Sequence, residues 1–576
     1  MDRMFTSGTR SLLLIVLGLL SLGASLPSAH SNTSYKVVRI RANSDRDVHV
    51  IHYLRHKYHL DPWRDVTRAH QVGDYLVRPQ HSDDVLRQLV DSDIHHEVVI
   101  NDVESFLRSN DAIKNRTRRS ATAHEHRHKF LTYDELLDFL HHAQNTATNA
   151  RVQVGSIGKS FEGRDTPYVK FSLQISRGND SEKGAIFIDS GIHSREWISP
   201  AMAAEMIHRL AFNDENDSAV NSLLDMFTWI IVPLVNPDGY AFTFTPGLEN
   251  RLWRKSRAAG YSSDPYCYGV DLNRNFGYQW NNNPFHGGSA NPCSGTFSGP
   301  RSFSEPESRN VRDILLRNKN NIKGYLTLHS FGQFFLYPWG YSSDVEIDDE
   351  VDLYHVASAF ADAMKRKNYQ YQVGGSAKVL YPAAGGSDDY VRGMMGVKYA
   401  YTVELPPHES SKYGFLLPES DVMSVVSDTW EGIKAFAFRL YSYTKPLAFK
   451  KMTSRVSSSG FTAHPDVQRT VRYDNVERHG NDVHVKPLAS QADVGGRNGD
   501  AGKIFDNTKK KREVGTSIHA DKGARSKRKR VALLKTGRPL RRVNLKRSTG
   551  RRRSVAYKLQ QSRLLHNHTN PVSVLR

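Results

Sequence analysis

The stretch GAIFIDSGIHSREWISPAMAAEMIHRLA, residues 184–211, joins an apolar run to a helical pattern through a short polar segment. The run at 184–192 is almost continuously apolar, which is typical of a strand buried on both faces of a sheet. Ser199 and Pro200 are residue types favoured at the N-cap and the first position of a helix. The stretch therefore predicts a buried strand, a turn and a helix, with His193 and Glu196 in the turn.

The same alternation continues downstream. Apolar runs predict buried strands at residues 227–236, 323–331 and 398–405, and an amphipathic pattern predicts a long helix over residues 421–443. Strands that alternate with helices indicate an α/β fold with a mixed, mostly buried sheet flanked by helices. We expect this domain to occupy residues 120–445.

A smaller domain with a linker is expected ahead of it, over residues 32–119. Its extended and helical segments alternate at residues 35–40, 47–58, 74–79, 83–90 and 95–100. That order predicts a small α+β domain of the ferredoxin-like type with an antiparallel sheet.

Residues 1–25 have the features of a secretory signal peptide. Arg3 and Arg10 precede the apolar run Leu12–Leu22, which is too short to span a bilayer. We expect a secreted, extracellular protein without a transmembrane segment. Five N-x-S/T sequons agree with this route, at Asn32, Asn115, Asn179, Asn216 and Asn567.

Cys267 and Cys293 are the two cysteines of the chain. In an oxidising compartment we expect them to form a disulfide, which would contribute about 3 kcal/mol to stability. Two free thiols are the alternative.

The run RTRR at residues 116–119 lies in a polar linker between the two predicted domains. It predicts cleavage after Arg119 by a convertase or a trypsin-like protease. A solvated charge run is the alternative, but the position between two domains favours processing.

The net charge of +19 is unevenly distributed. Residues 446–576 hold 31 Lys plus Arg and 9 Asp plus Glu, a net charge of +22, so the rest of the chain carries −3. Basic runs with few aromatic residues predict a disordered tail. Such a tail attracts heparin-like polyanions without sequence preference, and we expect no specific nucleic-acid partner.

Chemically useful side chains follow several of the predicted strands. His193 and Glu196 follow the first, His329 ends the strand at 323–331, and Glu404 ends the strand at 398–405. In α/β sheets ligands gather at the carboxyl ends of strands, and two His with one Glu form a ligand set of catalytic zinc. Taken singly, each histidine is more often an ordinary polar residue, and a structural ion pair is the alternative for Glu404.

Nine motifs occur in an order and at separations that resemble the zinc carboxypeptidases of the A/B type, most closely carboxypeptidase B with its activation peptide. The motifs are GIHSREWISP (191–200), VPLVNPDGY (232–240), RLWRKSR (251–257), GVDLNRNF (269–276), FSEPES (303–308), TLHSFGQ (327–333), YPAAGGSDDY (381–390), TVEL (402–405) and YGFLLP (413–418). The resemblance covers residues 120–445 densely and the smaller domain more loosely, through LDPW (60–63). It implies the zinc carboxypeptidase fold, with a mixed eight-stranded sheet, behind an inhibitory prodomain.

The resemblance also implies roles for individual residues. His193, Glu196 and His329 match the ligands of a single zinc ion. Glu404 matches the carboxylate that takes a proton from the zinc-bound water and passes it to the leaving amine. Arg254 matches the residue that stabilises the oxyanion of the transition state.

Further matches concern substrate binding. Asn273 and Arg274 match the pair that binds the C-terminal carboxylate of the substrate, a task that suits a guanidinium fork with an amide. Tyr381 matches the mobile tyrosine that covers the bound terminus, and Arg195 belongs with the outer subsites. The family usually has Tyr where this chain has Phe331, so a hydroxyl contact is lost and preference at the penultimate residue stays open.

Asp388 decides the predicted specificity. It occupies a position that is acidic in B-type enzymes and apolar in A-type enzymes, and a carboxylate at the floor of a pocket attracts Lys or Arg. Asp389 is common to both types, and small residues at 383–386 leave room for a long side chain. Capping of loop backbone is the alternative for Asp388.

These features together predict the secreted zymogen of a zinc exopeptidase that releases C-terminal Lys or Arg from peptides and proteins. One alternative is an A-type carboxypeptidase that releases apolar residues. Another is a protein that binds polyanions or matrix through its basic tail.

Overall fold

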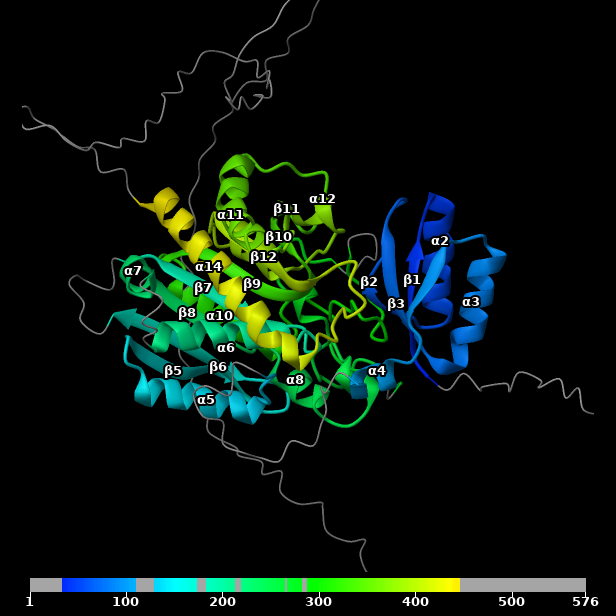
Figure 1. The fold of residues 1–576 in the computed structure, drawn as a ribbon, viewed down its shortest axis with the longest axis horizontal. Coiled ribbons are helices and arrows are strands. Elements are labelled where there is room, and N and C mark those ends of the chain that lie inside the picture. Colours follow the sequence, from blue (N-terminus) through cyan, green and yellow to red (C-terminus); the bar gives the residue numbers. More distant parts are fainter. Residues whose placement is uncertain are drawn as a thin grey trace, which may run out of the picture. The chain divides into compact units, whose positions relative to one another are not determined.

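A computed structural model describes residues 34–109, 129–173, 183–212, 219–264, 267–281 and 287–445 (Figure 1). The predicted signal peptide, the cleavage site at Arg119, the five sequons and the basic tail at 446–576 lie outside the described residues. Among the described residues, no helix combines the length and apolarity needed to cross a membrane.

The N-terminal domain is built on a four-stranded sheet with the order β2-β3-β1-β4. Its strands pair antiparallel, β3 with β1, β4 with β1 and β2 with β3. Its elements are β1 (Lys36–Arg41), α2 (Asp45–Lys57), β2 (Asp61–Arg64), β3 (Val72–Val77), α3 (Ser82–Asp91), β4 (His96–Ile100) and α4 (Val103–Ser109). The predicted α+β domain is confirmed, and the structure adds the short strand β2 and the helix α4.

The sequence explains this small domain well. The Ser44 side chain accepts a hydrogen bond from the Asp47 backbone amide, and the Asp47 side chain accepts one from the Ser44 backbone amide. This pair of hydrogen bonds is a capping box at the start of α2. The apolar faces of α2 and α3 meet the sheet in a core that includes Ile40, Ile51 and Leu89.

The larger domain is built on an eight-stranded sheet with the order β11-β10-β12-β9-β7-β8-β6-β5. Its strands are β5 (Ala150–Lys159), β6 (Asp165–Leu173), β7 (Ala185–Ser190), β8 (Thr228–Val232), β9 (Ile322–Gly332), β10 (Phe334–Tyr337), β11 (Gln372–Gly375) and β12 (Tyr399–His408). The four central strands β12, β9, β7 and β8 are parallel to one another. Antiparallel pairs form between β5 and β6, between β6 and β8, and between β10 and β12. The predicted mixed sheet is therefore confirmed.

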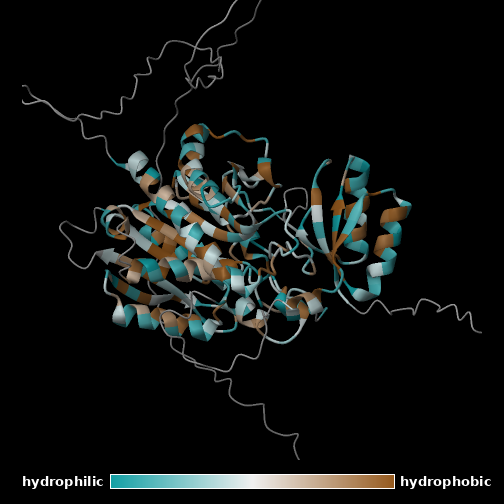
Figure 2. Ribbon diagram, in the orientation of Figure 1, coloured by the Kyte–Doolittle hydropathy of each residue, from teal (hydrophilic) through white to brown (hydrophobic). Residues whose placement is uncertain are grey.

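Helices cover both faces of this sheet. They are α5 (Tyr133–Thr146), α6 (Ile198–Ala211), α7 (Ala219–Met226), α8 (Pro237–Thr243), α9 (Leu248–Arg251), α10 (Pro306–Asn318), α11 (Glu350–Lys365), α12 (Ser376–Val379), α13 (Ser387–Gly393) and α14 (Val422–Thr444). The larger core lies under α5, α6, α11 and α14, and a second core lies under α10 and α13. Apolar residues run along the central strands and the facing sides of these helices (Figure 2).

The turn after β7 brings the chain out of the sheet toward the site. Gly191 has a φ of +63°, and a Cβ there would lie 2.7 Å from Leu234 Cδ1, so this tight turn requires glycine. The helix α6 then begins at Ile198 with Trp197 as its N-cap, so the prediction of Ser199 as N-cap is wrong. Ser199 lies in the first turn, where its hydroxyl donates to the Glu196 carbonyl at 3.0 Å and holds the turn against the helix.

Cys267 and Cys293 form a disulfide, which confirms their predicted pairing. The enclosed loop includes Asn273 and Arg274. The disulfide therefore restrains the segment that carries two predicted substrate-binding residues.

Candidate active site

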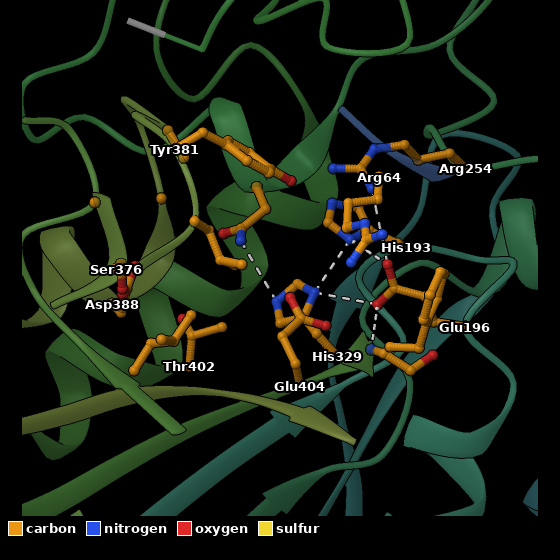
Figure 3. A pocket seen from close by; sticks show the side chains of 18 of the residues that line it. Arg64, His193, Glu196, Arg254, His329, Ser376, Tyr381, Asp388, Thr402 and Glu404 are labelled. Atoms are coloured by element: carbon orange, nitrogen blue, oxygen red, sulfur yellow. Dashed lines mark hydrogen bonds and ion pairs between the residues drawn. The ribbon is translucent and has the colours of Figure 1, made fainter. Parts of the chain in front are cut away.

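Three predicted metal ligands converge at the parallel centre of the sheet (Figure 3). His193 Nδ1 lies 2.9 Å from Glu196 Oε1 and 3.1 Å from His329 Nδ1. His329 Nδ1 lies 3.1 Å from Glu196 Oε2. All three side chains are buried, and the two histidines hold the pKa of Glu196 below its ordinary value although burial works to raise it.

The donor atoms fit a zinc ion. In a tetrahedral zinc site the ligand atoms lie about 2.0–2.1 Å from the metal and hence about 3.3 Å from one another, close to the spacings here. The two Nδ1 atoms face each other and the same carboxylate, and a dication satisfies the lone pairs of all three groups. The Nε2 atoms have other partners, Asp271 Oδ1 at 3.0 Å from His193 and Thr327 Oγ1 at 3.2 Å from His329.

Asp271 organises this site, although no sequence pattern separates it from the other residues of GVDLNRNF. Its carboxylate accepts from Arg254 Nη2 at 2.9 Å and from the Asn273 backbone amide at 3.1 Å, besides its contact with His193. Arg254 and His193 keep the pKa of Asp271 well below its ordinary value despite complete burial. A carboxylate behind a ligand histidine fixes the ring orientation and strengthens metal binding.

Glu404 lies beside the metal ligands on the neighbouring strand. The strands β12 and β9 are parallel neighbours, and Glu404 is the residue of β12 that pairs with His329 of β9. Its Oε2 is buried and has no hydrogen-bond partner among the described residues. Burial raises the pKa of Glu404 to about 8.

A cavity opens over these residues, with an empty volume of about 800 Å³ that extends into solvent. Arg254, Asn273, Arg274 and Tyr381 all line it. The Ser387 backbone amide donates to Asn273 Oδ1 at 3.0 Å and orients that amide. The Tyr381 ring points across the cavity toward the side of Arg254 (Figure 3).

Asp388 and Asp389 have different surroundings, although they are adjacent in α13. Asp388 lines the cavity and interacts with the Thr402 hydroxyl, and Ser376 lines the same cavity (Figure 3). Asp389 accepts from the backbone amides of Gly340 and Tyr341, each at 2.8 Å. Burial raises the pKa of both carboxyls. Asp388 is therefore the acid exposed to the cavity, whereas Asp389 ties α13 to the turn at 340–341.

The N-terminal domain reaches this site through β2. Trp63 and Arg64 line the same cavity. Arg195, which was predicted to contact substrate, donates from Nη1 to Asp61 Oδ2 at 2.6 Å and from Nη2 to the Pro62 carbonyl at 3.1 Å. This contact was not predicted, because a strand of four residues has too short a pattern to be recognised in the sequence.

Phe331 lies in an aromatic cluster at the mouth of the cavity. Its ring centroid is 5.0 Å from that of Phe415, which in turn is 5.5 Å from Trp63. Phe331 therefore packs edge-on against Phe415.

The positions of His329 and Glu404 at strand ends were predicted incorrectly. β9 continues to Gly332 and β12 to His408, so both residues lie inside strands. The extension arises because β10 follows β9 at once and pairs with β12 across Phe334 and Glu404.

Comparison with known proteins identifies the family of the chain. Residues 137–432 match the zinc carboxypeptidase family, and residues 38–110 match the carboxypeptidase activation peptide. Carboxypeptidase B of Astacus astacus is 42% identical over 285 residues, covering 49% of this chain and 88% of that protein. Carboxypeptidase B of Helicoverpa zea is 36% identical over 419 residues, covering 70% of this chain and 93% of that protein.

A crystal structure of carboxypeptidase A from Helicoverpa armigera aligns with a TM-score of 0.63 and 32% identity, over 72% of this chain and 99% of that one. Relatives of both the A and the B type are therefore similar to this chain. The chain belongs to the zinc carboxypeptidase family, as a zymogen that carries the family's activation peptide.

Proposed function

We propose that the processed enzyme releases C-terminal Lys and Arg residues from peptides and proteins. The observation that carries this proposal is the position of Asp388, a buried carboxyl that lines the cavity while its neighbour Asp389 is bound to backbone amides. A cationic side chain that enters the cavity meets this acid and the Thr402 hydroxyl with which it interacts.

The geometry around the ligand triad supports the proposed catalytic roles. His193, Glu196 and His329 would hold a zinc ion, which when bound would supply Lewis-acid chemistry for the scissile carbonyl and for a water nucleophile at neutral pH. Glu404 accepts a proton and passes it to the leaving amine, because its free carboxylate oxygen is buried beside the triad. Arg254, held by Asp271 at 2.9 Å, donates to the oxyanion that develops on the substrate.

Binding of the terminal carboxylate falls to Asn273 and Arg274. Arg274 donates from Nε to the Gly287 carbonyl at 2.8 Å and from Nη1 to the Asn273 carbonyl at 3.0 Å. These two hydrogen bonds fix the position of its guanidinium. Both side chains line the cavity, and a fixed guanidinium beside an amide suits a carboxylate. Tyr381 covers the bound terminus.

The proposed specificity is tested with matched peptides that end in Arg, Lys, Phe or Glu, using the processed enzyme with zinc. Higher kcat/KM for Arg or Lys supports it. Faster release of Phe contradicts it and favours the A-type alternative, in which Asp388 has a structural role only.

Secretion and activation form the next part of the proposal. The signal-like residues 1–25 and the run at 116–119 support a secreted zymogen that is cleaved after Arg119. An Arg119→Ala chain expressed in convertase-competent cells is expected to reach the medium unprocessed. Processing equal to that of the wild type contradicts this assignment.

The basic tail supports an additional binding function. Its net charge of +22 over residues 446–576 is sufficient to bind heparin-like polyanions. The full chain is expected to be retained on heparin and to elute with salt, and a chain that ends near residue 445 is expected to lose this retention. Unchanged retention contradicts the assignment.

A further inference from the structure

His329 has a second ring nitrogen on the side away from the other two ligands. Its Nδ1 faces the other members of the triad. Its Nε2 lies 3.2 Å from Thr327 Oγ1 and 3.4 Å from Asn273 Nδ2. A metal ion on Nδ1 leaves the proton of the neutral ring on Nε2, so this nitrogen becomes a donor. His329 therefore needs an acceptor on this side when the metal is bound.

The hydroxyl of Thr327 is the acceptor that the geometry offers. The Ser387 backbone amide donates to Asn273 Oδ1 at 3.0 Å. The Asn273 atom that faces His329 is therefore the amide nitrogen, which is itself a donor. The Thr327 hydroxyl accepts through its oxygen and still has its own proton to donate. Because Thr327 is fully buried, that proton needs an acceptor inside the protein.

Asp189 has a carboxylate oxygen that is suited to accept this proton. Asp189 of β7 pairs with Thr327 of β9, so the two side chains are neighbours on the same face of the sheet. Burial raises the pKa of Asp189 to about 6, and the hydroxyls of Tyr325 and Thr327 act to lower it. Asp189 Oδ2 accepts from the Tyr325 hydroxyl at 2.6 Å. Its buried Oδ1 makes no hydrogen bond within the part of the chain that the structure describes, which is unfavourable for a carboxylate oxygen.

We propose that Thr327 and Asp189 are positioning residues that orient His329 for zinc, as Asp271 orients His193. When the metal is bound, Nε2–H of His329 donates to Thr327 Oγ1, and the Thr327 hydroxyl donates to Asp189 Oδ1. Every polar atom of this chain of three residues then has a partner. The inference rests on the proposed role of His329 as a metal ligand, and it does not depend on which C-terminal residue the enzyme releases.

The test measures the zinc affinity of the full chain by competition with a chromogenic chelator. Thr327→Val keeps the shape of the side chain without the hydroxyl and is expected to weaken zinc binding by about tenfold. Thr327→Ser keeps the hydroxyl and is expected to bind zinc nearly as the wild type does. The matched control is Thr429→Val, because Thr429 is an equally buried threonine whose hydroxyl donates to the Val425 carbonyl in α14.

Two results with these variants overturn the inference. One is equal zinc affinity in Thr327→Val and in the Thr429→Val control. The other is a loss in Thr327→Ser as large as that in Thr327→Val, because the loss then follows from packing and not from the hydroxyl.

A double variant tests whether Asp189 acts through Thr327. Asp189→Asn alone is expected to weaken zinc binding by about tenfold. Adding it to Thr327→Val is expected to cause no further loss, because the hydroxyl that connects Asp189 to His329 is already absent. Losses that add in the double variant overturn the proposed connection.

A crystal structure of the zinc-loaded wild-type chain tests the same contacts without any substitution. Thr327 Oγ1 is expected to lie within about 3.2 Å of both His329 Nε2 and Asp189 Oδ1. Another group in place of the Thr327 hydroxyl at Asp189 Oδ1 overturns the inference while the zinc site and the proposed function stand. A wild-type chain that binds no zinc overturns the inference together with the proposed function.

Discussion

Glu404 and His329 face each other as paired residues on the adjacent parallel strands β12 and β9. The hydrogen bonds of the sheet therefore fix the separation between the predicted base and one predicted metal ligand. His193 and Glu196 join them from the turn after β7, which is the next strand in the sheet. Three neighbouring strands thus position the reacting groups, and loop closure is not required to assemble them.

Replacing Glu404 by Gln is expected to lower kcat by about 100-fold to 10,000-fold, because an amide of the same shape cannot accept the proton. Zinc content and KM should change little. The measurement is steady-state kinetics together with metal analysis of the purified variant. Activity within tenfold of the wild type, at equal zinc content, would show that another group transfers the proton.

Removal of the metal is expected to abolish activity and to lower the melting temperature. The triad is buried, and without the ion two imidazoles and a carboxylate face each other at about 3 Å. A chelator should produce both changes, and added Zn²⁺ should reverse them. Full activity in a preparation free of metal would contradict the assignment of the triad.

Asp271→Asn is expected to weaken zinc affinity by about 10-fold to 100-fold, because the carboxylate behind His193 is lost. Arg254 also loses its ion pair, so kcat should fall at saturating zinc. Competition with a chromogenic chelator measures the affinity. Asp264→Asn, an exposed acid on the same part of the chain, is the control and should leave affinity unchanged. Equal affinity in both variants would exclude a role for Asp271 in positioning His193.

Opening the disulfide should affect both stability and binding. The double variant Cys267→Ser with Cys293→Ser is expected to lose about 3 kcal/mol of unfolding free energy. Because the loop includes Asn273 and Arg274, KM should rise more than kcat falls. Thermal unfolding and kinetics on one Arg-ended peptide measure the two effects. An unchanged KM would show that the loop is held by its other contacts.

Most of the fold follows from the pattern of the sequence. Long apolar runs such as the one at 184–192 predict the central strands, because strands buried on both faces need continuous apolar side chains. The predicted ends of helices and strands were less accurate, as at Ser199 and Glu404. Contacts with the rest of the folded chain determine where a helix or strand ends. The contact of Asp61 with Arg195 was not predictable, since it joins residues 134 positions apart through a strand of four residues.

Several residues of the candidate site could be selected from the sequence, but the contacts between them could not. His193, Glu196, His329 and Glu404 could be selected because their residue types match zinc chemistry. Asp271 was missed because an isolated acid in a loop has no distinguishing pattern. Its importance depends on simultaneous contacts with His193 and Arg254, which only the folded chain brings together.

The pH dependence of specificity should report the state of Asp388. Burial raises its pKa, so the carboxyl gains its proton as the pH falls through a value above the ordinary Asp pKa of about 4. Below that value the pocket loses its negative charge. The ratio of kcat/KM for Arg-ended peptides to kcat/KM for Phe-ended peptides should therefore decrease as the pH is lowered. A ratio independent of pH in the wild type would contradict a charged Asp388 as the basis of selectivity.

The most direct test of the proposed specificity is the same ratio measured for Asp388→Asn at neutral pH. The substitution keeps the shape of the side chain and removes its charge. We predict that the ratio of Arg release to Phe release falls by about 100-fold, with kcat for the Phe-ended peptide nearly unchanged. A ratio in Asp388→Asn equal to that of the wild type would contradict the account.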